Sequence, residues 1–190
     1  TICTHFLPAE IISYLLAKEA IQTRLSIVVT DLDVHAMWLS RRFHHYFVAL
    51  EEARTHLVMT GLPAERITVS GIPIDPVFSV RKGREALCAR HQVDPARPLL
   101  LVSMGAMGKV VAREIVRALA HLVTPAQVAF VCGVHQEQAE LLRAEVAQVR
   151  APHLQFRVLG HTPDMDEWMR MASLLIGNPG RRFAMSDKTR

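Results

Sequence analysis

Cysteine and aromatic residues are scarce in this sequence, and it contains no long hydrophobic run. The three cysteines, Cys3, Cys88 and Cys132, are far apart and odd in number. They exclude a disulfide framework and a Cys-x-x-Cys metal site, and they indicate a reducing cytoplasm. Aromatic residues make up 6% of the chain and its arginines are scattered, so we expect no nucleic-acid surface of basic and stacking side chains. No apolar run reaches the roughly 18 residues that a membrane-spanning helix needs.

The residues that are abundant indicate a folded domain with a slightly basic surface. Half of the 190 residues are hydrophobic and 21% are charged, which suits a packed core and argues against disorder. The net charge of +4 favours anionic partners such as phosphates or a membrane surface. The histidines and arginines of 41–45 are typical of a solvated face, and the alternative is contact with lipid phosphates.

Segments with strand character alternate with helical segments along the chain. The expected strands are 1–3, 25–30, 46–50, 66–71, 98–105, 127–133, 154–160 and 173–178. The expected helices are 8–21, 51–61, 83–93, 111–122, 135–149 and 165–172. Such alternation predicts parallel sheets with right-handed crossovers. The segment GIPIDPVF, 71–78, has two prolines and a glycine, and we expect it to be an irregular linker between two Rossmann-like halves.

The loops that follow strands in the second half are candidates for a ligand site, because open α/β sheets bind ligands beyond the carboxyl ends of their strands. In SMGAMG, 103–108, glycines allow backbone N–H groups to approach a phosphate, although a plain tight turn fits equally well. The loops CGVH, 132–135, and GHTPDM, 160–165, contain Gly133, His135 and His161. Lone loop histidines are more often solvated or bonded to backbone than ligands.

TDLDVH, 30–35, is the richest stretch of the first half. In an extended chain, Asp31, Asp33 and His35 share one face, as a divalent-metal site requires. A second interpretation is structural: Asp31 caps a following helix while His35 and Trp38 pack at the sheet edge. A third is a polar wall for a hydroxyl-bearing substrate. The residues alone leave these three open.

Several motifs together resemble a known family. THFLPAEIIS, VVTDLDVHAMWLS, HYFVALEEARTHL, GLPAERITVSGIPIDPVF and MDEWMRMASLLIGNPG are similar to segments of the monogalactosyldiacylglycerol synthases and processive diacylglycerol glycosyltransferases. The resemblance runs from Thr1 to about Gly180. It implies the GT-B fold, an α/β arrangement of two Rossmann-like parallel-sheet domains facing a cleft. It also implies inverting transfer of a hexose from a UDP-sugar to diacylglycerol, without a cofactor and without a metal held by Asp-x-Asp.

The resemblance assigns candidate roles to residues of both halves. On the acceptor side, 1–70, the candidates are His5, Asp31, His35 and Trp38. On the donor side, 79–190, Ser103, Gly105 and Gly108 match the loop that contacts the nucleotide phosphates. The donor candidates that lie toward the uracil are His161, Thr162 and Met165, and Gly133 is a further donor-side candidate. The implied partners are a UDP-sugar, diacylglycerol or a similar lipid, and an anionic membrane surface at which the protein is peripheral.

The chain departs from the family pattern at three places. It lacks the family's early glycine-rich loop with a histidine, so we expect any catalytic base to lie N-terminal to Thr1. Its glycine loop carries Met104 and Met107 at positions where the family commonly has smaller or aromatic residues, and no Glu-bearing helix follows GNPG. We therefore expect both domains to be incomplete and this chain alone to transfer no sugar. The alternatives are an enzyme resembling UDP-N-acetylglucosamine 2-epimerase and a non-catalytic remnant.

Overall fold

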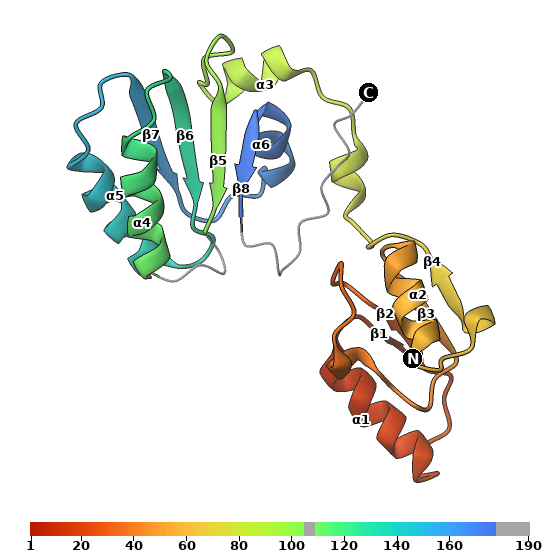
Figure 1. Ribbon diagram of the computed structural model, residues 1–190. Helices are drawn as coiled ribbons and strands as arrows, with labels where there is room; N and C mark the ends of the chain where they lie inside the picture. Colours follow the sequence, from red (N-terminus) through yellow and green to blue (C-terminus); the bar gives the residue numbers. More distant parts are fainter. Residues whose placement is uncertain (105–108, 178–190) are drawn as a thin grey trace. The chain divides into compact units, whose positions relative to one another are not determined.

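A computed structural model describes residues 1–104 and 109–177 of the chain (Figure 1). The chain divides into two compact units. The first comprises Thr1–Asp75, and the second begins at Pro76. Each unit has its own parallel sheet and its own hydrophobic core.

The first unit is built on a four-stranded parallel sheet in the order β1-β2-β3-β4. Its strands are β1 (Ile2–Cys3), β2 (Ser26–Val28), β3 (His45–Val48) and β4 (Ile67–Val69). Its helices are α1 (Phe6–Ala17), α2 (Glu51–Met59) and the 3-10 helices Ala36–Trp38 and Ala64–Arg66. The β-branched run of β2 is buried, with Ile27 0% and Val28 8% exposed on its two faces, as expected of a strand covered on both faces. Gly61, with φ +92°, ends α2 as its C-cap position predicts.

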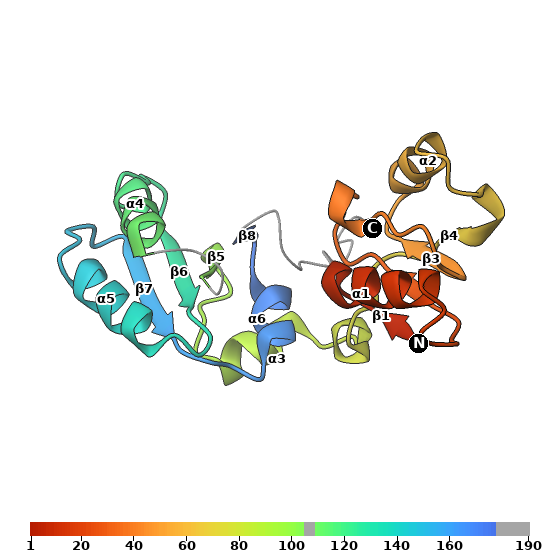
Figure 2. The same ribbon diagram turned by 90° about the horizontal axis from the view of Figure 1, so that it is seen from below.

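The second unit has the strand order β7-β6-β5-β8, again all parallel. Its strands are β5 (Leu99–Ser103), β6 (Ala126–Val131), β7 (Leu154–Leu159) and β8 (Leu174–Ile176). Its helices are α3 (Arg84–Arg90), α4 (Lys109–Ala120), α5 (Gln136–Ala147) and α6 (Met165–Met171). Residues of α4 and α5 share one core cluster with the sheet, whereas residues of α3 and α6 share another, so the two helix pairs cover opposite faces (Figure 2). The prediction of parallel α/β halves is confirmed.

Several expected boundaries are wrong in detail, and the first helix, expected over 8–21, spans Phe6–Ala17. Helix α1 begins at Phe6, two residues before Pro8, because the side chain of His5 caps it by accepting the N–H of Leu7 at 3.2 Å. The segment 71–78 is not irregular throughout, since Pro76–Ser79 forms a 3-10 helix. Pro76 is at the first position of this helix. The fixed φ of proline suits a helical turn, and the N–H that proline lacks is one that the first position would not use as a donor.

The stretch that leads from this 3-10 helix into α3 is attached to α6. Arg170 donates a hydrogen bond to the carbonyl oxygen of Phe78 at 3.1 Å. The ammonium group of Lys82 lies 2.7 Å from a carboxylate oxygen of Asp166. The residues just after Pro76 are therefore part of the second unit and not a free connection.

Candidate functional site

Asp31, His35 and Trp38 come together in the loop that follows β2. The indole N–H of Trp38 donates to Oδ2 of Asp31 at 2.8 Å, and Nε2 of His35 lies 3.3 Å from the same oxygen. Trp38 is only 1% exposed, whereas the side chain of His35 is 45% exposed. The buried indole therefore fixes the carboxylate, and the carboxylate orients an imidazole that solvent can reach.

His5 joins this group through Phe6. The ring of His5 lies 4.2 Å from that of Phe6, and the ring of Phe6 meets His35 and Trp38 edge to face at 5.3 and 5.8 Å. The loops after β1 and β2 are also linked directly, since the hydroxyl of Thr30 donates to the carbonyl oxygen of Thr4 at 3.2 Å. Because β1 and β2 are parallel neighbours, all four acceptor-side candidates lie beyond their carboxyl ends, where α/β sheets hold ligands.

The structural interpretation of Asp31 is half right. Trp38 does pack into the core, but Asp31 caps no helix, because its carboxylate accepts the indole N–H instead. His35 occupies the N-cap position of the 3-10 helix Ala36–Trp38 and makes no side-chain cap hydrogen bond. Sequence analysis missed Phe6, although an aromatic residue at a helix start just after a strand is a usable signal.

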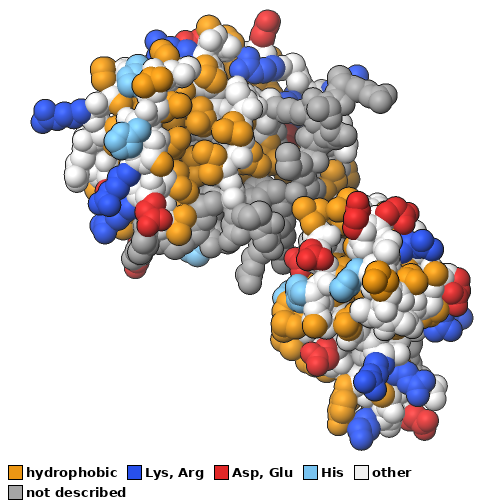
Figure 3. All heavy atoms as spheres, in the orientation of Figure 1, with side chains coloured by type: hydrophobic (Ala, Val, Ile, Leu, Met, Phe, Trp, Pro, Cys, Tyr) orange, Lys and Arg blue, Asp and Glu red, His pale blue; other side chains and the backbone are white. Residues whose placement is uncertain are grey.

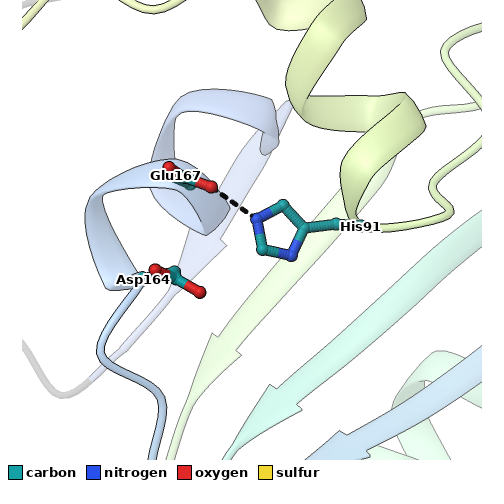
Figure 4. A group of neighbouring side chains, drawn as sticks. All are labelled: His91, Asp164 and Glu167. Carbon is teal, nitrogen blue, oxygen red and sulfur yellow. Dashed lines mark hydrogen bonds and ion pairs between the residues drawn. The ribbon is translucent and has the colours of Figure 1, made fainter.

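Within residues 1–104 and 109–177, the only group of three metal-ligating side chains is His91, Asp164 and Glu167 in the second unit (Figure 4). Asp31, Asp33 and His35 do not form such a group. The loop bends into the 3-10 helix Ala36–Trp38, so the spacing that aligns the three side chains in an extended chain is lost.

The donor-side candidates follow the carboxyl ends of three neighbouring strands. Ser103 ends β5, Gly133 follows β6 with φ +62°, and His161 and Thr162 follow β7. The loops after β6 and β7 approach closely, since a Cβ added at Gly160 would lie 3.8 Å from the carbonyl oxygen of Gly133. Gly105 and Gly108 lie outside the described residues.

The candidates differ in how near they lie to the topological switch point of the sheet. The chain moves from β5 outward to β6 and β7 and then returns to the other side of β5 to form β8, so the topological switch point lies between β5 and β8. Ser103 is at this point, where doubly wound sheets bind nucleotides. Thr162 accepts the backbone N–H of Asp164 at 3.2 Å and so shapes the turn into α6. Met165 begins α6 and packs against the core cluster of α3 and α6.

Glu167 is the most strongly perturbed acid among the described residues, and sequence analysis missed it. Its side chain is 4% exposed, and it contacts Lys82 at 2.8 Å, Arg90 at 3.0 Å and Nε2 of His91 at 2.6 Å. The pKa of Glu167 is lowered from 4.5 to about 2. The hydrogen bond from Lys82 is the largest cause, and the hydrogen bond from His91 is the second. The cations come from the segment before α3 and from its C-terminal end, so the cluster fastens α3 to α6.

Comparisons with known proteins agree with this architecture. Residues 1–74 match the family model described as monogalactosyldiacylglycerol (MGDG) synthase. A processive diacylglycerol beta-glucosyltransferase of Staphylococcus epidermidis is 28% identical over 91% of this chain and 44% of its own length. The enzyme of the same name from Bacillus cytotoxicus is 32% identical over 84% of this chain and 41% of its own length. The chain thus spans less than half the length of these curated relatives.

Two solved structures share the fold. The MurG structure of Acinetobacter baumannii has a TM-score of 0.59 and 22% identity, covering 94% of this chain and 46% of that one. The structure of Anabaena HepE in complex with UDP has a TM-score of 0.59 and 14% identity, covering 92% and 51%. The fold is that of the GT-B glycosyltransferases, and the chain is a relative of the monogalactosyldiacylglycerol synthase and processive diacylglycerol glycosyltransferase family.

Proposed function

We propose that this chain corresponds to a part of an inverting glycosyltransferase that transfers a hexose from a UDP-sugar to diacylglycerol. The observation that carries the proposal is the match to diacylglycerol glucosyltransferases over 91% of the chain, through both units. The first unit supplies acceptor contacts and the second supplies donor contacts. Rate then comes from holding the hydroxyl and the leaving diphosphate in one geometry.

The proposed acceptor site is the group formed by Asp31, His35 and Trp38. The exposed imidazole of His35, held by Asp31, offers a hydrogen bond to the acceptor hydroxyl. The rings of His5 and Phe6 beside it give an apolar wall for the glycerol end of the lipid. In this proposal the role of His35 is to position the acceptor hydroxyl.

The proposed donor site lies beyond β5, β6 and β7. HepE, which shares the fold, is solved with UDP and with UDP-glucose, and this supports a UDP-sugar as the donor. Ser103, Gly105 and Gly108 are proposed to hold the diphosphate. Backbone N–H groups there would stabilise the negative charge that develops as UDP leaves. The uracil is assigned to His161, Thr162 and Met165, and Gly133 is proposed as a further donor contact.

We propose that helix α1 binds the surface of an anionic membrane. Leu7, Ile11 and Tyr14 are spaced i, i+4 and i+7 on α1, and all three are exposed. Lys18 continues this stripe, and its ammonium lies 5.8 Å from the Tyr14 ring. Figure 3 shows hydrophobic and basic side chains beside one another in the region of α1. No helix in the described ranges is long and apolar enough to span a bilayer, and an apolar stripe with flanking cations suits peripheral binding.

The test replaces the matching segment of the Staphylococcus epidermidis relative with residues 1–177 of this chain. We expect the chimera to transfer label from UDP-glucose or UDP-galactose into mixed micelles of diacylglycerol, scored as lipid-phase counts. No lipid counts from a folded chimera, while the parent enzyme is active, would contradict the proposal. Lipid-independent conversion of UDP-N-acetylglucosamine would instead identify the epimerase alternative.

Donor binding is tested separately by calorimetry of UDP with this chain. We expect Gly105→Val to weaken binding by about tenfold or more, because a side chain would keep the backbone from the phosphates. Gly83→Val is the matched control, since an added Cβ at Gly83 meets no atom within 4 Å. Equal UDP affinity of Gly105→Val and the parent would overturn the phosphate assignment.

A further inference from the structure

A groove of about 800 Å³ lies between the C-terminal half of α5 and the strand β7. These two elements lie side by side at one end of the second unit in both ribbon views (Figures 1 and 2). Val146 of α5 and the alternate strand residues Leu154, Phe156 and Val158 give the groove apolar walls. None of the donor-side candidates lines it.

The charge of the groove has one sign. Arg143 and Arg150 line it and are exposed, and no acidic side chain is among the lining residues. In the described part of the chain, neither arginine forms an ion pair, because Glu145, which lies between them in sequence, is paired with Arg113 at 2.7 Å. Arg157 also lines the groove and keeps its charge, but its guanidinium is held by hydrogen bonds to the backbone oxygens of His91 and Gln92.

Strand β7 is an edge strand with backbone groups directed away from the sheet. It pairs with β6, whose Ala126 and Cys132 donate their N–H groups to the carbonyl oxygens of His153 and Leu159. In a parallel ladder the N–H and C=O of one residue point to the same side, and the side alternates along the strand. The odd-numbered residues therefore face β6, and Phe156 and Val158 direct both groups outward. In the described ranges no strand pairs with this side of β7.

We propose that this edge binds an extended acidic segment of a protein partner as an added strand. Backbone hydrogen bonds to Phe156 and Val158 would supply affinity, as in other strand additions. Alternate side chains of the segment point to one face of the sheet, so apolar residues would enter the groove. Acidic residues at other groove-facing positions of the segment would pair with Arg143 and Arg150, which line the same groove. The interaction lies outside the proposed transfer reaction and does not depend on it.

A protein segment fits this surface better than an anionic lipid does. A lipid phosphate offers acceptors only, and it would leave the outward carbonyl oxygens of Phe156 and Val158 without donors. An extended chain offers N–H and C=O groups at the same repeat as the strand edge. Charged side chains usually protect an unpaired strand edge from pairing with other chains. Here the charges beside the edge are those of Arg143 and Arg150, which are both positive and therefore favour an acidic segment.

The experiment uses the full chain and an acetylated six-residue peptide, Thr-Glu-Thr-Val-Thr-Glu, which carries a fluorophore and has its valine and both glutamates on one face. We expect saturable binding by anisotropy, together with slower hydrogen exchange of the Phe156 and Val158 amides. Arg143→Glu and Arg150→Glu should each weaken binding about tenfold, the loss of one charge-assisted pair. Arg117→Glu on α4 is the matched control, because Arg117 is exposed and does not line the groove.

Two further probes separate backbone pairing from charge. The same peptide with alternate backbone nitrogens methylated should not bind, and the same peptide with lysines in place of its glutamates should not bind either. Absence of binding by the glutamate peptide would overturn the proposal, and so would equal binding of the methylated one. Binding of phosphatidylglycerol vesicles that is lost in Arg143→Glu, without peptide binding, would show that the groove serves lipid instead.

Discussion

Lys82 and Glu167, which are 85 positions apart in the sequence, form an ion pair at 2.8 Å. The same ammonium group bonds Asp166, so one lysine bridges two adjacent carboxylates, each on a side chain that is 4% exposed. Removal of Lys82 would leave both carboxylates desolvated without their main partner, which is the costly way to break such a pair.

The Glu167 cluster predicts a specific acid sensitivity. The pKa of Glu167 is lowered from 4.5 to about 2, so its contribution to the free energy of unfolding is present above pH 4.5. This contribution is lost as the pH falls from 4.5 toward 2, because the unfolded state then binds the proton more readily than the folded state. We expect the melting temperature of the parent to exceed that of Glu167→Gln at pH 7, with a gap that narrows below pH 4.5. A gap independent of pH would contradict the assignment.

Asp31→Ala tests the acceptor-side group. The indole N–H of the buried Trp38 would lose its acceptor, and an unsatisfied buried donor costs about 1–3 kcal/mol of stability. Asp31→Asn keeps an acceptor oxygen and should recover most of the loss. Urea unfolding of the three proteins measures this, with Asp33→Ala as the control because Asp33 is exposed nearby. If Asp33→Ala and Asp31→Ala destabilise equally, the indole contact is unimportant.

Tyr46→Phe should destabilise the first unit. The hydroxyl of Tyr46 is buried, donates to the carbonyl oxygen of Trp38 at 2.8 Å and accepts the N–H of Ser40 at 2.9 Å. Without it, two backbone groups lose their partner, at a cost of about 1–3 kcal/mol. Denaturant unfolding checks the value, and Tyr14→Phe at the exposed second tyrosine is the control.

Tyr46 also predicts an alkaline effect. Burial raises the pKa of Tyr46 above its usual 10.0. Its contribution to stability is therefore present below pH 10 and is lost as the pH rises above that value, since the unfolded state ionises first. The Tyr14→Phe variant keeps Tyr46 as its only tyrosine. Its phenolate absorbance should appear at a pH above the ordinary range of tyrosine ionisation, and at the same pH as unfolding. Ionisation near pH 10 in the folded protein would contradict the burial.

Sugar transfer by the chimera should survive chelation. Of the described residues, His91, Asp164 and Glu167 are close enough to hold an ion, but Lys82, Arg90 and His91 already saturate Glu167. A divalent cation would have to displace two permanent positive charges. We expect unchanged turnover with EDTA and no Mn²⁺ binding to this chain by calorimetry. Complete loss of transfer with EDTA, restored by Mn²⁺, would revive a metal site.

The sequence predicts the layers of this fold well because short-range chemistry determines them. The apolar residues of the run at 25–30 form a buried strand, as a run of this composition predicts. The run at 98–103 does the same. A helix that ends in this way needs a residue with positive φ just after its C-cap, and Gly61 supplies it.

Long-range partners could not be predicted in this way. Asp31 was expected to act on its nearest backbone, but its carboxylate meets an indole seven residues away, because the chain turns back after Val34 to bury Trp38. Asp166 and Glu167 resemble ordinary acids of a helix start. Only the packing of α6 against α3 brings Lys82, Arg90 and His91 to Glu167.

The bond from Arg170 to the carbonyl oxygen of Phe78 has a practical consequence for dissecting the chain. A boundary drawn at the first residue of α3 would cut away both this carbonyl group and Lys82, and would leave the buried Asp166 without its lysine, while Glu167 would keep only Arg90 and His91. An excised second unit that starts at Pro76 should therefore resist proteolysis, whereas one that starts at Arg84 should be degraded through α6.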